Sequence, residues 1–395
     1  MIKVTISTIG TLLIVNRNAI VLTAIYSLAL AMILDGLFQD ISSGGNAWKQ
    51  GDWLINNHDV VVRRGLFGSV LLLISSVFDF PVLVLLGVIQ GTIISLIFAL
   101  FWYAGVRNKN SDILTFLLLS PIFLIFSAND LQGSLRKEIL AYLSFLPLLF
   151  SLLQHGIVHL KYVFISLFLW TIAVSTHEAN VFFSPFIVAL TYIGFRSQGL
   201  KFHIALSSLA YIVISGVAFF YSMSFSSVES HTAVCAPLLK SGLNQDICSG
   251  AIRWLEYDVW YGMYRSRSVF ISWGLYYFVL TLVFMCTFIF YLFQSFYPFR
   301  VLCLFLLVNL FFLPLYFIAI DWGRWINFGM FSFVVLFIAI YIQDGRLHKI
   351  PRMNTFSWIS TLLFCIAWGV HHGGRAMFEF GFAKNSLAFF SVFGG

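Results

Sequence analysis

The chain of 395 residues is 60% hydrophobic and only 10% charged, with a mean hydropathy of +0.93. This composition excludes a soluble globular protein and predicts an all-α, polytopic integral membrane protein. The formal net charge of +7 does not indicate nucleic-acid binding, because the basic residues are scattered among short loops and form no continuous stripe.

Apolar segments of about 17–25 residues predict membrane-spanning helices. The first lies near 19–36, and because no small-residue cleavage site follows it, we expect no cleavable signal peptide. The remaining candidates, in chain order, are 81–104, 112–127, 138–154, 161–176, 180–195, 204–222, 269–293, 301–320, 326–343 and 355–371. They predict about 11 to 12 transmembrane helices in a single integral membrane domain, 1–395.

The apolar stretch 66–80 decides which side of the membrane every later loop faces. It is short and closes with Asp79, so we expect an interfacial or half-buried helix within 53–80 and not a complete span. A complete span at 66–80 would invert all the loops that follow.

The distribution of charge between loops favours one orientation. With a cytoplasmic N-terminus and eleven spans, eleven basic residues face the cytoplasm beside only Asp112 and Asp344. These basic residues are Lys3, Arg17, Arg107, Lys109, Lys161, Arg196, Lys201, Arg300, Arg346, Lys349 and Arg352. The other face then carries 12 of the 23 basic residues and 14 of the 16 acids, so the positive-inside rule does not decide alone. In this orientation the acids and arginines of the external face lie in the same loops. A polar site requires such a mixture, which supports the orientation.

The first external segment, 35–80, begins with Asp35 at the end of the first span. Its run 53–62 is expected to form an amphipathic helix lying on the membrane surface. The segment also carries Arg63 and Arg64. Charged groups close to a bilayer are costly unless they are paired or wetted, which makes these two arginines functional candidates.

Two basic clusters are candidates for phosphate binding. Arg63 and Arg64 precede Gly65, and forked guanidinium donors beside accessible backbone amides suit a phosphate clamp. Arg136 and Lys137 open a predicted span, where unpaired helix amides also favour an anion. The alternatives are anchoring to lipid headgroups for the first pair and a local salt bridge for the second.

His177 and Glu178 lie in the short polar turn that connects two predicted spans, 161–176 and 180–195. Such a turn must be buried in protein or line a cavity. A histidine beside a carboxylate can accept a proton near neutral pH, although a purely structural pair is the competing interpretation.

The run 321–325 places Asp321 and Arg324 between two tryptophans, Trp322 and Trp325, at a turn between spans. We expect Arg324 to contact phosphate, Asp321 to transfer a proton and the two indole rings to contact sugar. The alternative is a helix-hairpin turn with aromatic anchors and one ion pair.

The longest polar loop, 223–268, combines aromatic rings with charge. Its candidate sugar contacts are Trp254, Tyr257, Trp260, Arg265 and Arg267. An interfacial aromatic belt is the alternative. The same loop holds Cys235 and Cys248, a candidate disulfide that would place it in an oxidising compartment.

No cofactor is expected. The sequence lacks a zinc-binding pair of histidines four residues apart with a glutamate, a phosphate-binding glycine loop and a nucleophilic-serine elbow. His371 and His372 have no acid near them in the sequence until Glu379. A divalent metal held by Asp35 or Asp40 stays open.

Arginines without a nucleotide or metal motif favour an anionic substrate delivered within the bilayer, such as a glycan on a polyprenyl phosphate or pyrophosphate. The arginines would stabilise charge on the departing phosphate. Asp35, His177, Glu178 or Asp321 would take the proton of the attacking sugar hydroxyl.

The whole-chain pattern resembles the Wzy-type O-antigen polymerases and, more loosely, the GT-C-like membrane glycosyltransferases. The features that match are the number of spans, the 45 phenylalanines, the long loop 223–268 and the charged turns at 63–65, 136–138, 177–178 and 321–325. In GT-C enzymes an acid of the first external loop is catalytic, and Asp35 occupies the comparable place. That loop holds no Asp-x-Asp, which argues against a metal-dependent variant.

The resemblance implies a bacterial inner-membrane enzyme of lipopolysaccharide biosynthesis with its active site facing the periplasm. It would polymerise repeat units carried on undecaprenyl pyrophosphate, with a chain-length regulator as a partner.

Three alternatives remain open. The nearest is transfer of a single sugar from a polyprenyl-phosphate donor. A lipid-linked oligosaccharide flippase should carry charge at the middle of its spans and often two related halves, whereas here the charges lie at span ends and no repeat is visible. An O-acyltransferase would need a donor that is commonly cytoplasmic.

Overall fold

The computed structural model describes residues 6–225, 230–294, 297–345, 352–372 and 381–393, and these residues form helices and turns without a strand. The first half contains α1 (Ile6–Ser42), α2 (Gln50–Trp53), α3 (Gly65–Phe78), α4 (Val82–Arg107), α5 (Asp112–Leu118), α6 (Phe126–Asn129), α7 (Glu138–His155), α8 (Leu160–Thr176), the 3-10 helix η1 (Glu178–Phe183), α9 (Ser184–Arg196) and α10 (Lys201–Ser224).

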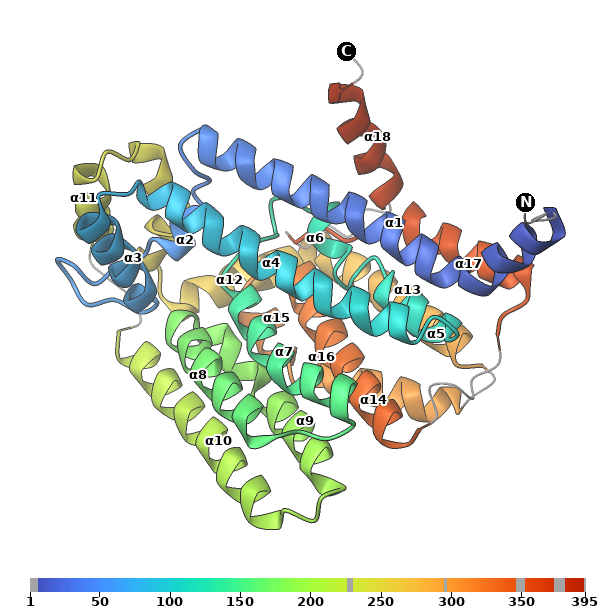
Figure 1. Ribbon diagram of the computed structural model, residues 1–395. Helices are drawn as coiled ribbons and strands as arrows, with labels where there is room; N and C mark the ends of the chain where they lie inside the picture. Colours follow the sequence, from blue (N-terminus) through green and yellow to red (C-terminus); the bar gives the residue numbers. More distant parts are fainter. Residues whose placement is uncertain (1–5, 226–229, 295–296, 346–351, 373–380, 394–395) are drawn as a thin grey trace.

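The second half contains α11 (Thr232–Lys240), the 3-10 helices η2 (Gln245–Cys248) and η3 (Arg253–Glu256), α12 (Val259–Val269), the π-helical turn η4 (Phe270–Gly274), α13 (Leu275–Leu292), α14 (Pro298–Leu310), α15 (Leu313–Ile318), α16 (Trp322–Gln343), α17 (Thr355–Ala367) and α18 (Gly381–Phe393). Figure 1 shows the long helices side by side, with α2, α3 and α11 together at one end. The all-α prediction is confirmed.

Seven segments of the described chain are long and apolar enough to cross a membrane. They are 16–42, 82–107, 138–155, 178–196, 201–224, 275–292 and 322–343. Four of the remaining helices, α3, α8, α14 and α17, are apolar but shorter. The structure thus contains the helices of a membrane protein, with fewer full-length candidates than the sequence predicted.

Helix α16 forms the centre of the bundle and packs against α7, α9 and α14. Nineteen of its residues are buried, from Trp322 to Tyr341. The Tyr142 ring of α7 stacks on the Phe331 ring of α16 with centroids 3.8 Å apart, and the Tyr142 hydroxyl donates to Asn327 Oδ1 at 2.5 Å. Because α16 begins with the run 321–325, its burial also positions those charged residues.

The prediction of a continuous span at 112–127 is wrong. Helix α5 ends at Leu118, and the chain then turns repeatedly before the short α6. Irregular backbone is tolerated at membrane depth only where protein covers it. Here the Asn327 side chain of α16 donates to two buried backbone carbonyls of this segment, Ile122 O at 2.8 Å and Phe123 O at 2.9 Å.

The predicted span 301–320 is also interrupted. Helix α14 ends at Leu310 and α15 begins at Leu313, followed by Pro314 at a first-turn position. Proline has no amide hydrogen to continue the earlier helix. The predicted last span ends early as well, since α17 stops at Ala367.

The prediction of a surface helix at 53–62 is wrong, because α2 ends at Trp53 and an irregular segment follows. Trp53, Leu54 and Ile55 are completely buried. The Trp53 indole donates to Leu135 O at 2.9 Å, and Asn56 donates to Val234 O at 2.8 Å. The first three apolar side chains of the run therefore face the protein interior, whereas Val61 is exposed.

Helix α3 does not carry the chain to the opposite end of the bundle. The Gln50 amide, before α3, donates to Gln90 Oε1 in α4 at 3.0 Å. Leu83, at the start of α4, lies against Gly45, in the turn after α1. The segments before and after α3 therefore lie at the same end of the helix bundle. The prediction that 66–80 is an interfacial helix and not a complete span requires this arrangement.

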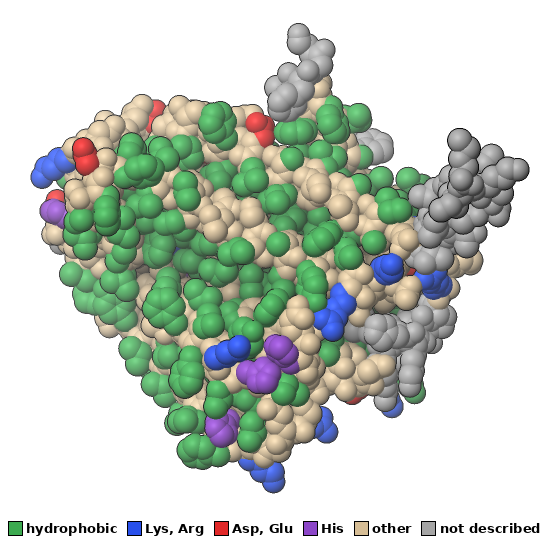
Figure 2. All heavy atoms as spheres, in the orientation of Figure 1, with side chains coloured by type: hydrophobic (Ala, Val, Ile, Leu, Met, Phe, Trp, Pro, Cys, Tyr) green, Lys and Arg blue, Asp and Glu red, His purple; other side chains and the backbone are tan. Residues whose placement is uncertain are grey.

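The turns predicted to face the cytoplasm gather at the other end. Gln343 donates to Gly156 O at 2.8 Å, and Gln198 donates to Val158 O at 3.0 Å. Arg17 pairs with Asp112 at 3.0 Å. In Figure 2 hydrophobic side chains cover much of the visible face, and most of its Lys, Arg and His side chains lie across the lower half.

The loop after α10 is closed by the Cys235–Cys248 disulfide, which joins α11 to η2 with Cα atoms 6.0 Å apart. Both cysteines are buried. The disulfide predicted from the sequence is thus present in the structure.

Labelling with a membrane-impermeant maleimide tests the arrangement of the two ends. In a Cys303→Ser background, Asp79→Cys and Asp246→Cys should react from one side of the membrane, and Asn110→Cys and Ser197→Cys only from the other. All four positions are exposed. Reaction of Asp79→Cys from the side of Asn110→Cys would mean that α3 crosses the membrane.

Removal of the disulfide by Cys235→Ser and Cys248→Ser should lower the thermal unfolding temperature of the detergent-solubilised protein. Loss of such a cross-link typically costs about 2–4 kcal/mol, because the unfolded chain is no longer constrained. A reducing agent should lower the wild-type value to that of the double variant and leave the double variant itself unchanged. A Cys303→Ser control, which keeps the disulfide, should unfold at the wild-type temperature without the reducing agent. Alkylation of both cysteines in untreated native protein would contradict the disulfide.

Candidate functional site

A polar cavity of about 400 Å³ lies among segments that are far apart in the sequence. Its charged or titratable lining residues are Asp52, Arg64, Arg136, His177, Arg265, Asp321, Arg324 and His372. Its tryptophans are Trp48, Trp254 and Trp325. We call this cavity the polar cavity.

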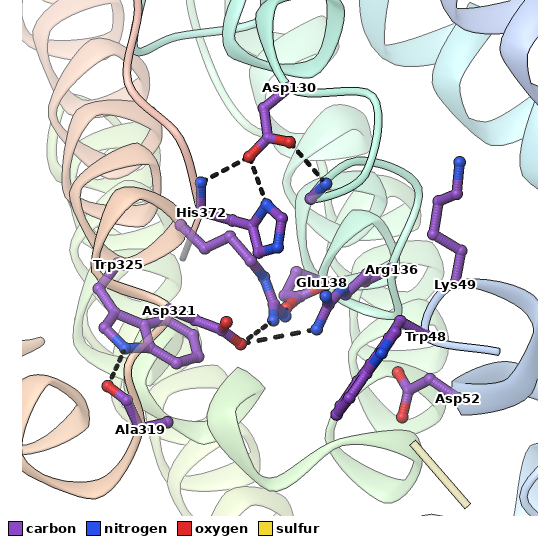
Figure 3. A network of polar contacts seen from close by, with 12 residues as sticks. Trp48, Lys49, Asp52, Asp130, Arg136, Glu138, Ala319, Asp321, Trp325 and His372 are labelled. Atoms are coloured by element: carbon purple, nitrogen blue, oxygen red, sulfur yellow. Dashed lines mark hydrogen bonds and ion pairs between the residues drawn. The ribbon is translucent and has the colours of Figure 1, made fainter. Parts of the chain in front are cut away.

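One ion-pair network surrounds the start of α16 (Figure 3). Arg324 Nη1 donates to Asp321 Oδ2, and the same guanidinium pairs with Glu138 at the start of α7. Arg136 Nη1 lies 3.5 Å from Asp321 Oδ2. The Arg324 guanidinium also stacks over the Trp325 ring, 5.1 Å from its centroid. Arg324 is nearly buried, so these carboxylates are required to compensate its charge.

A second network joins Arg64 to Glu178 and Asp52. Arg64 Nε donates to Glu178 Oε2 at 2.7 Å, and its Nη2 donates to the other carboxylate oxygen in a bidentate pair. Asp52 Oδ1 lies 3.5 Å from Arg64 Nη1, and Arg63 lies 3.8 Å from Glu178. The φ angle of Arg64 is +65°, a left-handed conformation that turns the chain into α3.

Lys137 does not line the polar cavity, although the sequence predicted a phosphate contact. Its side chain is fully buried, and Nζ donates to Arg64 O at 3.0 Å. Burial lowers the pKa of the Lys137 ammonium to about 8. This hydrogen bond stabilises the left-handed turn at Arg64. Lys137 therefore helps to position Arg64 without lining the cavity itself.

Arg136 differs from the other buried arginines of the cavity. Among the residues that the structure describes, its one ion pair is the 3.5 Å contact to Asp321, and its Nε is buried without a hydrogen-bond partner. The guanidinium stacks over the Trp48 ring, 5.7 Å from the centroid. An unsatisfied buried donor is costly, and an anion entering the cavity would satisfy it. Arg136 is therefore the side chain best prepared to bind a ligand.

His177 faces the polar cavity, but it is not arranged as a proton acceptor there. Its Nδ1 accepts the Ala179 amide hydrogen at 3.0 Å, which assigns the ring proton to Nε2. Burial and the neighbouring Arg64 lower the pKa of His177 to about 3, so the ring is neutral at physiological pH. His177 can donate a hydrogen bond into the cavity through Nε2.

The four predicted proton-transfer residues have different environments. Asp321 lines the polar cavity, whereas Glu178 is engaged by Arg64. Asp35 is on α1, accepts a hydrogen bond from Gln39 at 2.7 Å and does not line the cavity. The structure therefore brings Asp321 and His177 to the cavity and leaves Asp35 outside.

Asp52 lines the polar cavity, although the sequence did not single it out. Its side chain is 4% exposed, and Oδ2 is buried without a hydrogen-bond partner. Burial raises the pKa of this carboxyl, but Lys137 and other cationic neighbours outweigh burial and hold it below its ordinary value. The feature of the sequence that could have indicated Asp52 is its position next to Trp53 in the first external segment.

The aromatic candidates divide between the polar cavity and its surroundings. Trp254 lines the cavity beside Trp48, with ring centroids 5.9 Å apart. Tyr257 and Tyr261 stack on each other beside Trp254, with centroids 4.3 Å apart. Trp260 is 70% exposed and contributes nothing to the cavity lining. The rings form a platform on one side of the cavity.

An apolar cavity of about 490 Å³ lies on the other side of α12 and α15. Two predicted sugar contacts, Arg267 and Trp322, line this second cavity together with aromatic and aliphatic side chains. Trp322 and Asp321 are consecutive, so the polar and apolar cavities adjoin at the start of α16.

Other acids of the first external segment are paired. Asp40 forms an ion pair with Lys49, whose Nζ also donates to Leu131 O at 3.1 Å. Asp40 is therefore compensated by a cation and is not presented to a metal with Asp35.

Comparison with known proteins gives no relative: no protein-family model, no curated protein and no solved structure matches this chain.

The neutral state of His177 predicts a pH dependence of stability. The folded state holds the ring neutral down to about pH 3, whereas the ordinary pKa is 6.5. The unfolded state binds more protons between these values, so the free energy of unfolding falls as the pH falls below about 6.5. At pH 5 the loss from this residue is about 2 kcal/mol.

His177→Asn keeps an acceptor for the Ala179 amide and removes the titrating ring. Thermal unfolding in detergent at pH 7.5 and pH 5 should therefore depend less on pH in this variant than in the wild type. His155→Asn, at an exposed position of the opposite end, serves as the control. Equal pH dependence in wild type and His177→Asn would contradict the assignment.

Proposed function

We propose that this protein is a membrane glycosyltransferase that polymerises lipid-linked oligosaccharide repeat units. The donor is a glycan on a polyprenyl pyrophosphate, and the acceptor is a sugar hydroxyl of a second lipid-linked unit. The proposed location is the bacterial inner membrane, with the polar cavity facing the periplasm.

The observation that carries the proposal is the loosely held guanidinium of Arg136 in the polar cavity. Its 3.5 Å contact to Asp321 and its unpartnered Nε leave it free to bind an anion. Arg64 and Arg324 add positive charge from two further segments. Guanidinium groups suit phosphate because their donors match two phosphate oxygens at once.

The apolar cavity supports a lipid-linked substrate. It adjoins the polar cavity at Asp321 and Trp322 and is lined by side chains such as Phe270, Phe278 and Leu313. A polyprenyl chain there would bury apolar surface, while its phosphate groups reach the arginines. The tryptophans Trp48 and Trp254 suit stacking on sugar rings.

In the proposed reaction, the acceptor hydroxyl oxygen attacks the anomeric carbon of the donor sugar. The carbon–oxygen bond to the pyrophosphate breaks, and its electron pair remains on the departing phosphate oxygen. Arg136 and Arg324 stabilise that charge. As phosphate replaces Asp321 beside Arg136, the Asp321 carboxylate, still hydrogen-bonded to Arg324, takes the hydroxyl proton. Neutral His177 donates a hydrogen bond to a sugar or phosphate oxygen.

Transfer of a single sugar from a polyprenyl-phosphate donor would use the same groups and is the nearest alternative. A flippase is less well supported, because the charged networks gather at helix ends around one cavity and transporter sites lie near the middle of the bilayer.

Arg136→Lys and Arg324→Lys should each lower transfer activity about 10- to 100-fold, because lysine keeps the charge but loses the forked donors. Purified protein is assayed with lipid-linked repeat units, and products are resolved by length on gels. Arg196→Lys, exposed at the opposite end, is the matched control. Unchanged product length and rate in Arg136→Lys would remove this residue from the site.

The same substitutions separate the candidate functions in cells. Loss of a polymerase leaves single-repeat glycan on its lipid at the outer face, and loss of a flippase retains it at the inner face. Loss of a single-sugar transferase leaves the long chains but removes one component sugar.

A further inference from the structure

Asp130 and two consecutive histidines meet across 242 residues of sequence. The His372 ring Nδ1 lies 2.6 Å from Asp130 Oδ2, and the His371 ring Nδ1 lies 3.7 Å from Asp130 Oδ1. One ligand atom from each residue can be chosen so that all three lie within 4.8 Å of one another. The Asp130 side chain is 1% exposed, and the His371 side chain is 46% exposed.

Backbone contacts orient the carboxylate for this cluster. Asp130 Oδ1 accepts the Gly133 amide hydrogen at 3.0 Å, and Oδ2 accepts the His372 amide hydrogen at 2.5 Å. A side chain at Gly133 would lie 2.7 Å from both Asp130 Oδ2 and His372 Cβ, so only glycine permits this close approach. Such outer contacts are what hold metal ligands in place in proteins.

We propose that Asp130, His371 and His372 bind a divalent transition-metal cation of the zinc class beside the polar cavity. Two imidazole nitrogens and one carboxylate oxygen are ligands that such ions prefer. Three protein ligands leave a coordination position open. His372 also lines the polar cavity, so that position adjoins the place where an anion would enter.

Binding requires a small rearrangement of His372. Ligand atoms around a tetrahedral zinc ion are about 3.4 Å apart, and the His372 and Asp130 atoms are closer than that when they share a hydrogen bond. The cation replaces the shared proton, and the His372 ring moves away from the carboxylate. His371 needs little movement, because its Nδ1 is already 3.7 Å from the carboxylate.

The alternative is a structural clasp in which His372 merely hydrogen-bonds Asp130. His371 separates the two interpretations. At 3.7 Å its ring makes no hydrogen bond to Asp130 and is half exposed, so a clasp does not need it, whereas a three-ligand site does. The proposal concerns cation binding and stands whether or not the protein transfers glycans.

The test is Co²⁺ binding to tag-free protein in detergent, followed by visible absorption and by calorimetry with Zn²⁺ as competitor. His155 and His159, whose rings lie 4.8 Å apart, form a second pair capable of holding a cation. The measurement therefore uses His155→Ala/His159→Ala protein as its reference. One equivalent of Co²⁺ with tetrahedral absorption bands, displaced by Zn²⁺, is the expected result.

In that reference protein, His371→Ala should weaken Co²⁺ binding at least 10-fold, and adding His372→Ala should abolish it. His58→Ala, at a histidine paired only with its neighbour Asp59, should leave binding unchanged. Thermal unfolding confirms that each variant is folded. The proposal is overturned if the reference protein binds no Co²⁺, or if folded His371→Ala binds it as tightly as the reference.

Discussion

The cost of holding charge in a nonpolar bundle governs the arrangement of this protein. Arg324, near the start of the most buried long helix, has carboxylates from α7 and from its own N-terminal turn as partners. Arg64 has Glu178 and Asp52 in the same way. A buried ion without such partners would be destabilising by several kcal/mol. The pairs therefore require the turns that carry them to meet at one end of the bundle.

That requirement produces a cavity with unequal arginines. Arg64 and Arg324 are held by carboxylates, while Arg136 makes one long ionic contact and leaves Nε unpartnered. The paired arginines Arg64 and Arg324 hold the walls together and still add positive charge to the cavity lining, whereas the loosely held guanidinium of Arg136 is available to a ligand. The adjoining apolar cavity would accommodate the hydrocarbon chain of the proposed substrate. A substrate with an anionic group and a long apolar tail fits both properties together.

The sequence predicted the helices well where a segment was long and uniformly apolar. It failed at 112–127 and 301–320, which have the composition of spans but bend inside the protein. Hydropathy cannot distinguish lipid from a protein interior as the surroundings of an apolar segment. Asn327 shows the reason, because this α16 residue satisfies carbonyls about 200 residues away. The failure at 53–62 has the same cause, since Trp53 faces the protein core.

By itself, the sequence determined the all-α class with long apolar helices, the charged turns and the cysteine pair, because composition and local spacing carry that information. Only the tertiary structure decided which charges share a cavity. In the structure Asp35 lies outside the polar cavity, Lys137 lies beneath Arg64, and Asp52 is part of the cavity lining. The tertiary structure also joined Asp130 to His372, which no local pattern connects. Ion pairing and hydrogen bonding act between residues that are close in space, and packing around α16 sets those distances.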